Sequence, residues 1–371
     1  MNDKDNNSLV LNGPGFFDLA CYSRKSAADY NYLFNDKTNK ITFAKYTPHA
    51  KIQSNVRGYG NYTCLRGDLH CHTLWSDAYY GGTPGYIDDP FNTFRIYQGL
   101  GHDFVGISDH TFGLDSNKDT YDQRYDGKHT DGNPRGVKYA MSHSEWLKTV
   151  KHSNRADHNY NFTSLAGVEM SYGGAAIDIA HNSPDEIAHF NAFGYDDLYY
   201  GQPGKWENTA TSRNDVYRWA AETYKTNPTL VMQFNHPSNE GKGFNYFIES
   251  EAKDANGNLY NRDPFRLCEF FTISKKGQYR NYFRAYKKAL AQGWKVAPTA
   301  TSDNHDEIHE LKTIYKNIRT VVVSENQSKE SILNAMIARR VYATRIPKLN
   351  LFYSLTNSNN ENVVMLSLIH I

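Results

Sequence analysis

Blocks of two kinds alternate along most of the chain after residue 60. Stretches with apolar residues at helical spacing, usually closed by glycine, are followed by short apolar runs rich in Val, Ile and Phe. The runs have the length and composition of buried strands, and the longer stretches have the periodicity of helices that pack on one face. This alternation predicts an α/β protein whose parallel strands are covered by helices.

Capping residues delimit the predicted helices. Ser142 with Glu145 forms a capping box, Ser212 with Asp215 forms a second N-terminal cap, and Gly293 ends a later helix. The predicted helices span Asn92–Leu100, Ser142 to about His152, Ser212–Thr226, Tyr279–Ala291 and Ser328–Arg340.

About seven strands are predicted for a single βα barrel. They begin near Leu65, Asp103, Thr163, Ala188, Thr229, Arg266 and Lys295, and a further strand is predicted at 349–355. In βα barrels the functional groups lie at the carboxyl ends of the strands. Nearly every one of these runs leads into His, Asp or Glu, so the sequence predicts a site at that end.

The densest group of such residues is the segment 67–77, GDLHCHTLWSD. In an extended segment, positions i and i+2 point the same way, so His70 and His72 would direct two imidazoles at one point while Cys71 faces the other side. A His-x-His pair alone also fits a surface strand with two solvated histidines. The remaining strand ends distinguish the two interpretations.

Nine side chains at or near those ends are candidate metal ligands. They are His70, His72, Asp77, His110, Glu169, His189, His236, Asp303 and His305. Imidazole and carboxylate together suit Zn, Mn or Fe. One tetrahedral Zn takes four ligands, so nine candidates predict two to three divalent transition-metal ions.

Six segments carry a family resemblance across about residues 65–345: LHCHTLWSD, GISDH, GVE, AHFNAFG, FNHP and TSDNH, in this order. The chain resembles the polymerase and histidinol phosphatase (PHP) superfamily, and within it a poorly characterised branch that opens with G-D-L-H-x-H-T. The resemblance implies a distorted seven-stranded (β/α) barrel with a trinuclear metal site at the C-terminal ends of the strands.

The resemblance also implies how the ligands divide. One metal would be held by His70, His72, Glu169 and Asp303. Glu169 would bridge to a second metal, which His189 and His236 also bind. Asp77, His110 and His305 would hold the third, although the family varies between His and Asp near position 77. Asp109 is expected to fix an imidazole tautomer, and Asp68 to support the site or cap a backbone group.

Other acidic and imidazole groups are set aside. His181 competes with His189, but the strand context favours His189. Six histidines are predicted to be surface residues: His102, His129, His143, His152, His158 and His309. Glu269 is left out because its strand supplies no ligand in the family that the chain resembles.

The favoured hypothesis is a metal-dependent hydrolase that cleaves a small phosphorylated substrate through a metal-bound hydroxide, because clustered divalent ions lower the pKa of bound water and neutralise phosphoryl charge. Glu169, Asp303 and His110 are its candidate catalytic residues, and no serine or cysteine triad pattern competes. One alternative is an amidohydrolase-like hydrolase of C–N or C–O bonds, in which a modified lysine usually takes the position of Glu169. Another is a non-catalytic metal-binding accessory barrel.

A basic turn follows the sixth predicted strand. Ser274-Lys275-Lys276-Gly277 could place an ammonium group against a phosphate oxygen at the barrel mouth, so Lys275 and Lys276 are candidate substrate-binding residues. The alternative is a solvated turn, since lysine is mostly exposed in proteins.

Composition and charge are those of a soluble globular protein. The net charge of +1, with 22% charged residues, implies no general attraction to nucleic acid or anionic membranes. No run of 18 apolar residues is present, and the start, MNDKDNNSLVLNG, lacks the features of a signal peptide. Four cysteines without a C-x-x-C pair suit a reducing compartment. We therefore expect a cytoplasmic location, or a periplasmic one if the N-terminus is incomplete.

Three segments are expected along the chain. Residues 1–60 are polar and poorly periodic and would pack as an extension on the barrel, which would occupy 61–365. The last six residues, LSLIHI, match the translated end of a widely used sequencing adapter. We expect 366–371 to be an assembly scar on a chain cut short near Met365, so His370 is not a candidate ligand.

Overall fold

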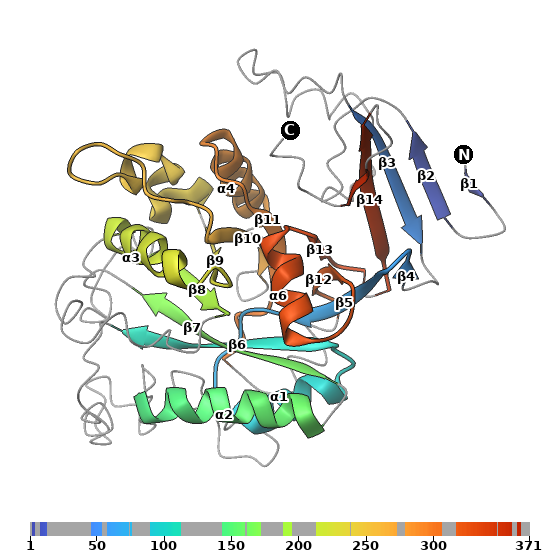
Figure 1. Ribbon diagram of the computed structural model, residues 1–371, viewed down its shortest axis with the longest axis horizontal. Helices are drawn as coiled ribbons and strands as arrows, with labels where there is room; N and C mark the ends of the chain where they lie inside the picture. The colour runs from blue at the N-terminus through green and yellow to red at the C-terminus, as the bar shows by residue number, and fades with distance from the viewer. Residues whose placement is uncertain are drawn as a thin grey trace.

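The computed structural model describes a barrel-like α/β body and a separate smaller sheet (Figure 1). The described residues are 2–3, 8–12, 46–53, 58–73, 75, 90–112, 143–159, 162–171, 188–194, 213–237, 239–272, 279–305, 317–346, 348–357 and 362–364.

Nine strands form the main sheet in the order β11-β10-β9-β8-β7-β6-β5-β12-β13, and the two-residue β4 pairs beside β5. Their bounds are β4 Gly58–Tyr59, β5 Tyr62–Asp68, β6 Phe104–Phe112, β7 Thr163–Ser171, β8 His189–Phe193, β9 Val231–Phe234, β10 Phe265–Thr272, β11 Ala297–Thr301, β12 Arg319–Ser324 and β13 Val341–Thr344. Strands β9, β11 and β12 are short and buried along their whole length, as expected for strands of a sheet covered on both faces.

The sheet curls until its first strand meets the other end. Thr320 in β12 hydrogen-bonds to the backbone of Ala300 in β11, accepting from its N–H at 3.0 Å and donating to its carbonyl at 2.8 Å. Beyond these strands, the N–H of Asp303 donates to His70 O at 2.8 Å and the N–H of His72 donates to Asn304 O at 3.0 Å. The barrel therefore closes directly between the two segments that carry the His-x-His pair and Asp303.

The sequence prediction of seven strands is wrong in number and in direction. All seven predicted strands are present as β5 to β11, but β12 and β13 extend the same sheet. In addition, β8 runs antiparallel to both β7 and β9, whereas the prediction had parallel strands. An alternating or continuous apolar pattern is the same in either direction, so it could not reveal this reversal.

Helices pack around the sheet, as Figure 1 shows for α1 and α2 below it and α3 and α4 above. Their bounds are α1 Pro90–Gly99, α2 His143–Asn159, α3 Arg213–Thr226, α4 Tyr279–Ala291 and α6 Lys329–Ile337, with 3₁₀ helices η6 Asn239–Phe247 and η7 Glu249–Ala252. Helix α6 begins after an N-cap, where the Ser328 side chain accepts from the N–H of Ser331.

Helix α2 extends to Asn159, seven residues beyond its predicted end. Its buried face continues through Thr149, Ser153 and Ala156, which are each fully buried. Small and hydroxyl-bearing residues contribute little to a hydrophobic pattern, so the sequence did not show this continuation. The hydroxyl of Ser153 donates to the Ser164 carbonyl in β7 at 2.6 Å, which ties the helix to the sheet.

Aromatic side chains fill the space between β8–β10 and the neighbouring helices. Phe190, Phe234 and Phe265 pack on one another with ring centroids 5.1–5.9 Å apart, and Tyr217 and Trp294 close the cluster. These rings contribute much of the buried apolar area. They give the site-bearing strands a rigid support.

The smaller sheet has the order β1-β2-β3-β14-β15. Its strands are β1 Asn2–Asp3, β2 Ser8–Asn12, β3 Tyr46–Gln53, β14 Asn350–Asn357 and β15 Asn362–Val364. The strand predicted at 349–355 is thus confirmed, but it pairs with β3 and not with the barrel. Tyr342 joins the two sheets, since its hydroxyl donates to Leu349 O at 2.8 Å and accepts from Leu351 N at 3.0 Å. The division into 1–60, 61–365 and 366–371 stays a prediction, and the last segment lies outside the described residues.

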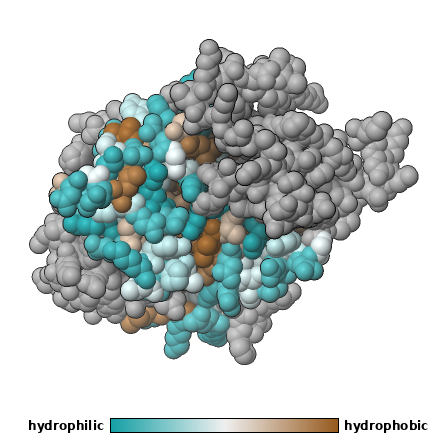
Figure 2. Space-filling model, turned by 45° about the horizontal axis from the view of Figure 1, so that its top comes forward, coloured by the Kyte–Doolittle hydropathy of each residue, from teal (hydrophilic) through white to brown (hydrophobic). Residues whose placement is uncertain are grey.

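The described surface is mostly hydrophilic on the face seen in Figure 2, where hydrophobic atoms form small separate groups. Large hydrophobic side chains are exposed at four described positions, Leu147, Tyr246, Leu259 and Ile346. Within the described part of the chain, no helix has both the length and the apolarity needed to cross a membrane.

Candidate metal centre

Eight of the nine predicted ligands lie within the described residues, and all eight gather at one end of the barrel. His70 and His72 lie in the extended segment after β5, Asp303 and His305 follow β11, and His236 follows β9. His110 and Glu169 are direct partners in the register of β6 and β7. The ninth residue, Asp77, lies outside the described residues.

The reversed strand β8 explains why His189 reaches the same place. His189 is the first residue of β8, whereas the ligands of parallel strands stand near the carboxyl ends. Because β8 is antiparallel, its first residue pairs with Ser171 at the carboxyl end of β7. His189 therefore lies at the same end of the barrel as the other candidates because of a strand reversal that the sequence did not show. The competing His181 lies outside the described residues.

Four of these side chains surround a single point. The Nε2 atom of His70 lies 3.2 Å from both Glu169 Oε2 and Asp303 Oδ1. The Nε2 atom of His72 lies 3.3 and 3.4 Å from the same two oxygens. These four residues are the set that the family resemblance implied for one metal.

The spacing of these atoms fits a tetrahedral ion. With metal–ligand bonds of about 2.0–2.1 Å, the corners of a tetrahedron are about 3.3–3.4 Å apart. The four nitrogen–oxygen distances of 3.2–3.4 Å match that edge. Two imidazoles and two carboxylates are also a ligand set that transition metals prefer. The residues present therefore fit a bound divalent ion.

Two further groups share residues with the first. One contains His110, Glu169 and His189, and the other contains His72, His110 and His305. In the latter, the ring of His72 stacks on those of His305 and His110 with centroids 4.0 and 4.6 Å apart. His236 lies beside the former, with its Nε2 atom 3.1 Å from His189 Nδ1.

Solvent access differs across the cluster. The side chains of His70, His72 and Glu169 are at most 1% exposed, whereas His236, His189 and His305 are 14%, 16% and 29% exposed. Three members of the four-residue group are therefore sealed from water, whereas Asp303, at 11%, and the outer histidines are partly exposed to solvent. Structural metal sites are closed throughout, while catalytic sites keep an open side.

The carboxylates of the cluster hold negative charge. Burial alone would raise the pKa of Glu169, but the imidazoles of His70, His110 and His189 more than reverse this and hold it well below its usual range. Burial likewise opposes ionisation of Asp303, and His70 together with its neighbours lowers the pKa of that carboxyl well below normal. The cluster thus offers the charge state that a cation requires.

The pKa values of two imidazoles in the cluster shift in opposite directions. Burial lowers the pKa of His70, but Glu169, Asp303 and Glu269 outweigh burial and raise it well above its usual value. For His189 burial dominates and lowers the pKa to about 4, so this ring is neutral near pH 7. Neutral imidazole is the metal-binding form, and a metal ion displaces the proton from a charged one.

Comparison with known proteins gives several likenesses to solved structures, two of which follow. No family model and no curated protein matches the chain. A two-domain protein from Bacteroides vulgatus, named as containing a predicted PHP-like metal-dependent phosphoesterase, is 16% identical with a TM-score of 0.47, over 82% of this chain and 78% of that one. A predicted metal-dependent phosphoesterase from Bifidobacterium adolescentis is 12% identical with a TM-score of 0.33, over 74% and 96%.

Acidic residues beside the ligands hold the backbone that carries them. Asp68 accepts from the backbone N–H groups of His70 and Ser302 at 3.1 Å, so its predicted capping role is confirmed. Asp109 accepts from the N–H and the hydroxyl of Thr73 at 2.7 Å, next to His72. The prediction that Asp109 fixes an imidazole tautomer stays a prediction.

Two ligand positions adopt an unusual backbone. His236 has φ 28° and Asp303 has φ 49°, in the left-handed region that non-glycine residues rarely enter. Such strain persists only where the surroundings hold it, and it clusters at functional sites. Here the N–H of Asp303 is held by His70 O, which joins the strained residue to the ligand segment beside it.

Glycine permits a close approach beneath Glu169. A Cβ atom on Gly167 would lie 2.3 Å from the ring of Phe193 in β8. Only glycine therefore allows β8 to pack against this part of β7. In the Gly-Val-Glu segment, Gly167 meets this packing requirement, and the candidate ligand Glu169 follows two residues later.

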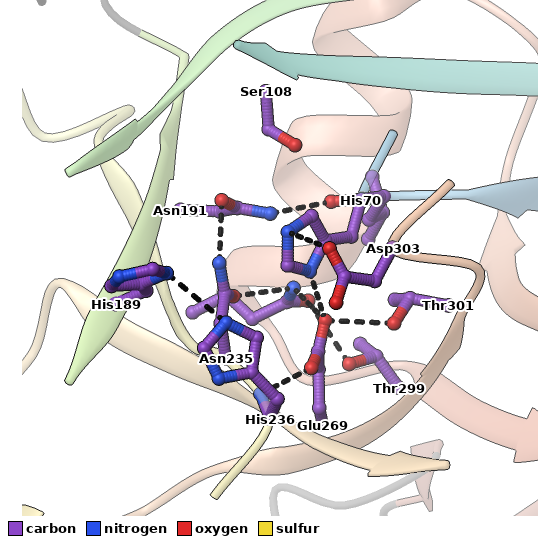
Figure 3. A network of polar contacts seen from close by, with 12 residues as sticks. His70, Ser108, His189, Asn191, Asn235, His236, Glu269, Thr299, Thr301 and Asp303 are labelled. Atoms are coloured by element: carbon purple, nitrogen blue, oxygen red, sulfur yellow. Dashed lines mark hydrogen bonds and ion pairs between the residues drawn. The ribbon is translucent and has the colours of Figure 1, made fainter. Parts of the chain in front are cut away.

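Sequence reasoning gave no role to a set of buried polar residues under the candidate ligands, three of which, Asn191, Asn235 and Glu269, are labelled in Figure 3. They are Asn191, Gln233, Asn235 and Glu269, all fully buried. Asn235 Nδ2 donates to Glu169 Oε1 at 2.8 Å and to Asn191 Oδ1 at 2.6 Å. Polar residues inside otherwise apolar strand runs, such as VMQF and LCEFF, were the available signal, because buried polar groups require partners.

The histidines set aside from the sequence have mixed outcomes. The surface prediction is wrong for His102, which is buried with its ring edge-on to Tyr97 at a centroid distance of 4.9 Å. Burial lowers the pKa of His102 well below its usual value, so this ring is neutral. His152 is half-buried against Trp75 and Phe91. His129 and His309, together with Lys275 and Lys276, lie outside the described residues, and the side chains of His143 and His158 are not described.

Proposed function

We propose that this chain is a metal-dependent hydrolase that cleaves a phosphoester with two to three divalent ions held at the barrel end. One observation carries the proposal. The two oxygens of Glu169 face two different imidazole groups: Oε2 lies 3.2–3.3 Å from nitrogens of His70, His72 and His110, and Oε1 lies 3.0–3.3 Å from nitrogens of His189 and His236. A single buried carboxylate shared in this way is the arrangement of a bridging ligand.

Phosphoester cleavage is the reaction that this arrangement favours. When bound, adjacent divalent ions lower the pKa of coordinated water toward neutrality and stabilise the attacking and leaving oxygens of an in-line displacement. The order of the six segments shared with the PHP superfamily supports the same reaction class.

The role that we propose for each side chain follows from how deeply it is buried. Glu169 and Asp303 supply the buried negative charge, and His70 and His72 close the inner side against water. His110 stands between the inner and outer groups and belongs to two of the three sets. His189, His236 and His305 border the open side, where a phosphoryl group would approach. Asp77 remains our candidate for an additional ligand there.

The amidohydrolase-like alternative is less well supported. That class usually bridges two metals through a modified lysine, and the bridging position here is Glu169. A non-catalytic accessory barrel would not require the outer histidines to face an opening. Both alternatives remain outcomes of the experiment below.

Metal content and substrate screening test the proposal together. Protein purified without chelator should contain two to three equivalents of Zn, Mn or Fe, because more ligands are assembled than one tetrahedral ion can use. Elemental analysis measures this, and a panel of small phosphomonoesters, phosphodiesters and nucleotides measures hydrolysis. A reproducible content at or below one equivalent would exclude the trinuclear arrangement, and hydrolysis of amides alone would favour the alternative.

Substrate anchoring by Lys275 and Lys276 is part of the proposal. Replacing either lysine with Ala should raise KM for an anionic substrate several-fold and leave metal content unchanged, since only a binding interaction is lost. Steady-state kinetics on the phosphoester found in the panel provide the measurement. Unaltered KM in both single variants and in the double variant would assign this turn to the solvated surface.

A further inference from the structure

Glu269 lies beneath the ligand cluster in β10 and is fully buried. Its Oε1 atom is 2.6 Å from His70 Nδ1 and accepts from the Thr301 hydroxyl at 2.7 Å. Gln233 Nε2 donates to the same oxygen at 3.3 Å. Its Oε2 atom accepts from the backbone N–H of His236. Figure 3 shows the carboxylate at the centre of these contacts.

These contacts fix the tautomer of His70. A carboxylate accepts hydrogen bonds, so the Nδ1 atom of His70 must carry the proton that points at Glu269. The lone pair of the neutral ring is then on Nε2, which faces Glu169 Oε2 and Asp303 Oδ1 at 3.2 Å. The other ring nitrogen of a metal-binding histidine commonly donates to a carboxylate in this way.

The second oxygen holds a strained backbone. His236 has φ 28°, and it precedes Pro237, which also restricts its conformation. A charge-assisted hydrogen bond from its N–H to Glu269 Oε2 stabilises this conformation. The imidazole of His236 is thereby kept with its Nε2 atom 3.3 Å from Glu169 Oε1.

A chain of side chains keeps Glu269 in place. Thr299 Oγ1 donates to Gln233 Oε1 at 2.9 Å, and Gln233 Nε2 donates to Asn235 Oδ1 at 3.0 Å as well as to Glu269. Asn235 then donates to Glu169. The buried polar groups are thus joined from β11 to β7, and a connected network of this kind is rigid when its members are satisfied.

We propose that Glu269 is a positioning residue that couples the two imidazole groups around Glu169. One of its oxygens sets the tautomer of His70, and the other sets the backbone of His236 on the opposite side of Glu169. This inference rests on the proposed function, because it assumes that the cluster binds metal. It assigns a role in metal affinity to a residue that is not itself a ligand.

Glu269→Gln separates this role from simple packing. The amide has nearly the shape of the carboxylate, but its NH₂ group is a hydrogen-bond donor. In the native site the groups that contact the two Glu269 oxygens are themselves donors, so the NH₂ group would meet a donor in place of an acceptor. If the NH₂ faces His70, the ring must place its proton on Nε2 and loses the lone pair that faces the ligands. If it faces His236, two N–H groups oppose each other. Either orientation disturbs one imidazole.

A matched control is available in the same network. Thr299→Val removes the hydrogen bond to Gln233 while keeping the shape of a fully buried side chain, and it touches neither histidine. The Zn²⁺ affinity of this variant shows how much is lost when a hydrogen bond of the network is removed and the contacts of Glu269 with both histidines are kept. Glu269→Asp provides a conservative comparison, since it restores the charge but is one methylene shorter.

The experiment measures Zn²⁺ affinity by competition with a chromophoric chelator, and the stability of each metal-free variant by urea unfolding. Glu269→Gln should bind Zn²⁺ about 10–100-fold more weakly than the native protein. Thr299→Val should stay within about threefold, and Glu269→Asp should recover part of the loss. Hydrolysis by Glu269→Gln should recover partly at saturating Zn²⁺, as expected for weakened affinity.

Two outcomes would overturn the proposal: native affinity in Glu269→Gln, or an equal loss in Thr299→Val, which would indicate general packing. If Glu269→Gln does not fold, Glu269→Asp takes its place, with a several-fold loss expected against the same control. A native protein that binds Zn²⁺ but hydrolyses no phosphoester would refute the proposed function and leave the affinity result for Glu269 intact. A native protein that binds none of Zn²⁺, Mn²⁺ and Fe²⁺ would refute both.

Discussion

Replacing Glu169 with Gln is expected to remove bound metal and hydrolysis together. Glu169 is buried and its two oxygens face five imidazoles, so the substitution removes the negative charge that two ion positions would share. Loss of one preorganised electrostatic group in a water-excluded site costs about a hundred- to a thousandfold in rate. The loss of a bridging ligand should reach at least the upper end of that range. Elemental analysis and kcat/KM on the same preparation provide the measurement.

The matched control is Glu222→Gln, the same substitution at an exposed position on α3. It should retain native metal content and activity, and so should His143→Ala at the first residue of α2. Far-UV circular dichroism would show that Glu169→Gln keeps its fold. If Glu169→Gln behaved like these controls, Glu169 would not be a ligand and the proposed centre would be wrong.

Removing metal with a chelator is expected to abolish hydrolysis and to lower the midpoint of thermal unfolding. The folded chain buries Glu169, Asp303 and Glu269 close together, and a divalent ion offsets the repulsion between them. A ligand present at a thousandfold above its Kd stabilises the folded state by about 4 kcal/mol. For a chain of this size that corresponds to a shift of about 5 °C.

Calorimetry before and after chelation measures the shift, and adding Zn²⁺ or Mn²⁺ back should reverse it. The Glu169→Gln variant should show little change on chelation, because it has already lost its metal. Identical midpoints for the native protein with and without chelator would contradict the presence of buried metal in the fold.

The sequence signals that selected the candidate ligands are local, and the structure brings eight of those nine residues to one end of the barrel. Alternation along an extended segment places His70 and His72 on one side, whatever the rest of the chain does. The strands that deliver His110 and Glu169 are short apolar runs, and the structure places both residues in register on neighbouring strands. Helix ends were equally local, and α4 has the predicted bounds, Tyr279–Ala291.

Local patterns did not give the direction or the partners of the strands. The apolar run of β8 reads the same in both directions, so its reversal became visible only in its pairing with β7 and β9. The strand at 349–355 was recognised as a strand, yet its place beside β3 depends on residues far away in the chain. The prediction of seven strands was wrong because it omitted β12 and β13, whose place in the sheet depends on pairing with β5 and with each other.

The sequence by itself determined which residue types stand at the strand ends, and with them the chemistry of the site. Only the tertiary structure decided how those residues group together, and that Glu269, an acidic residue within an apolar run, contacts both His70 and His236. The physical reason is that strand composition and side-chain alternation act between neighbours in the chain, whereas hydrogen bonds such as that of His70 with Glu269 join residues brought together by strand order and register. Those long-range contacts are properties of the closed barrel.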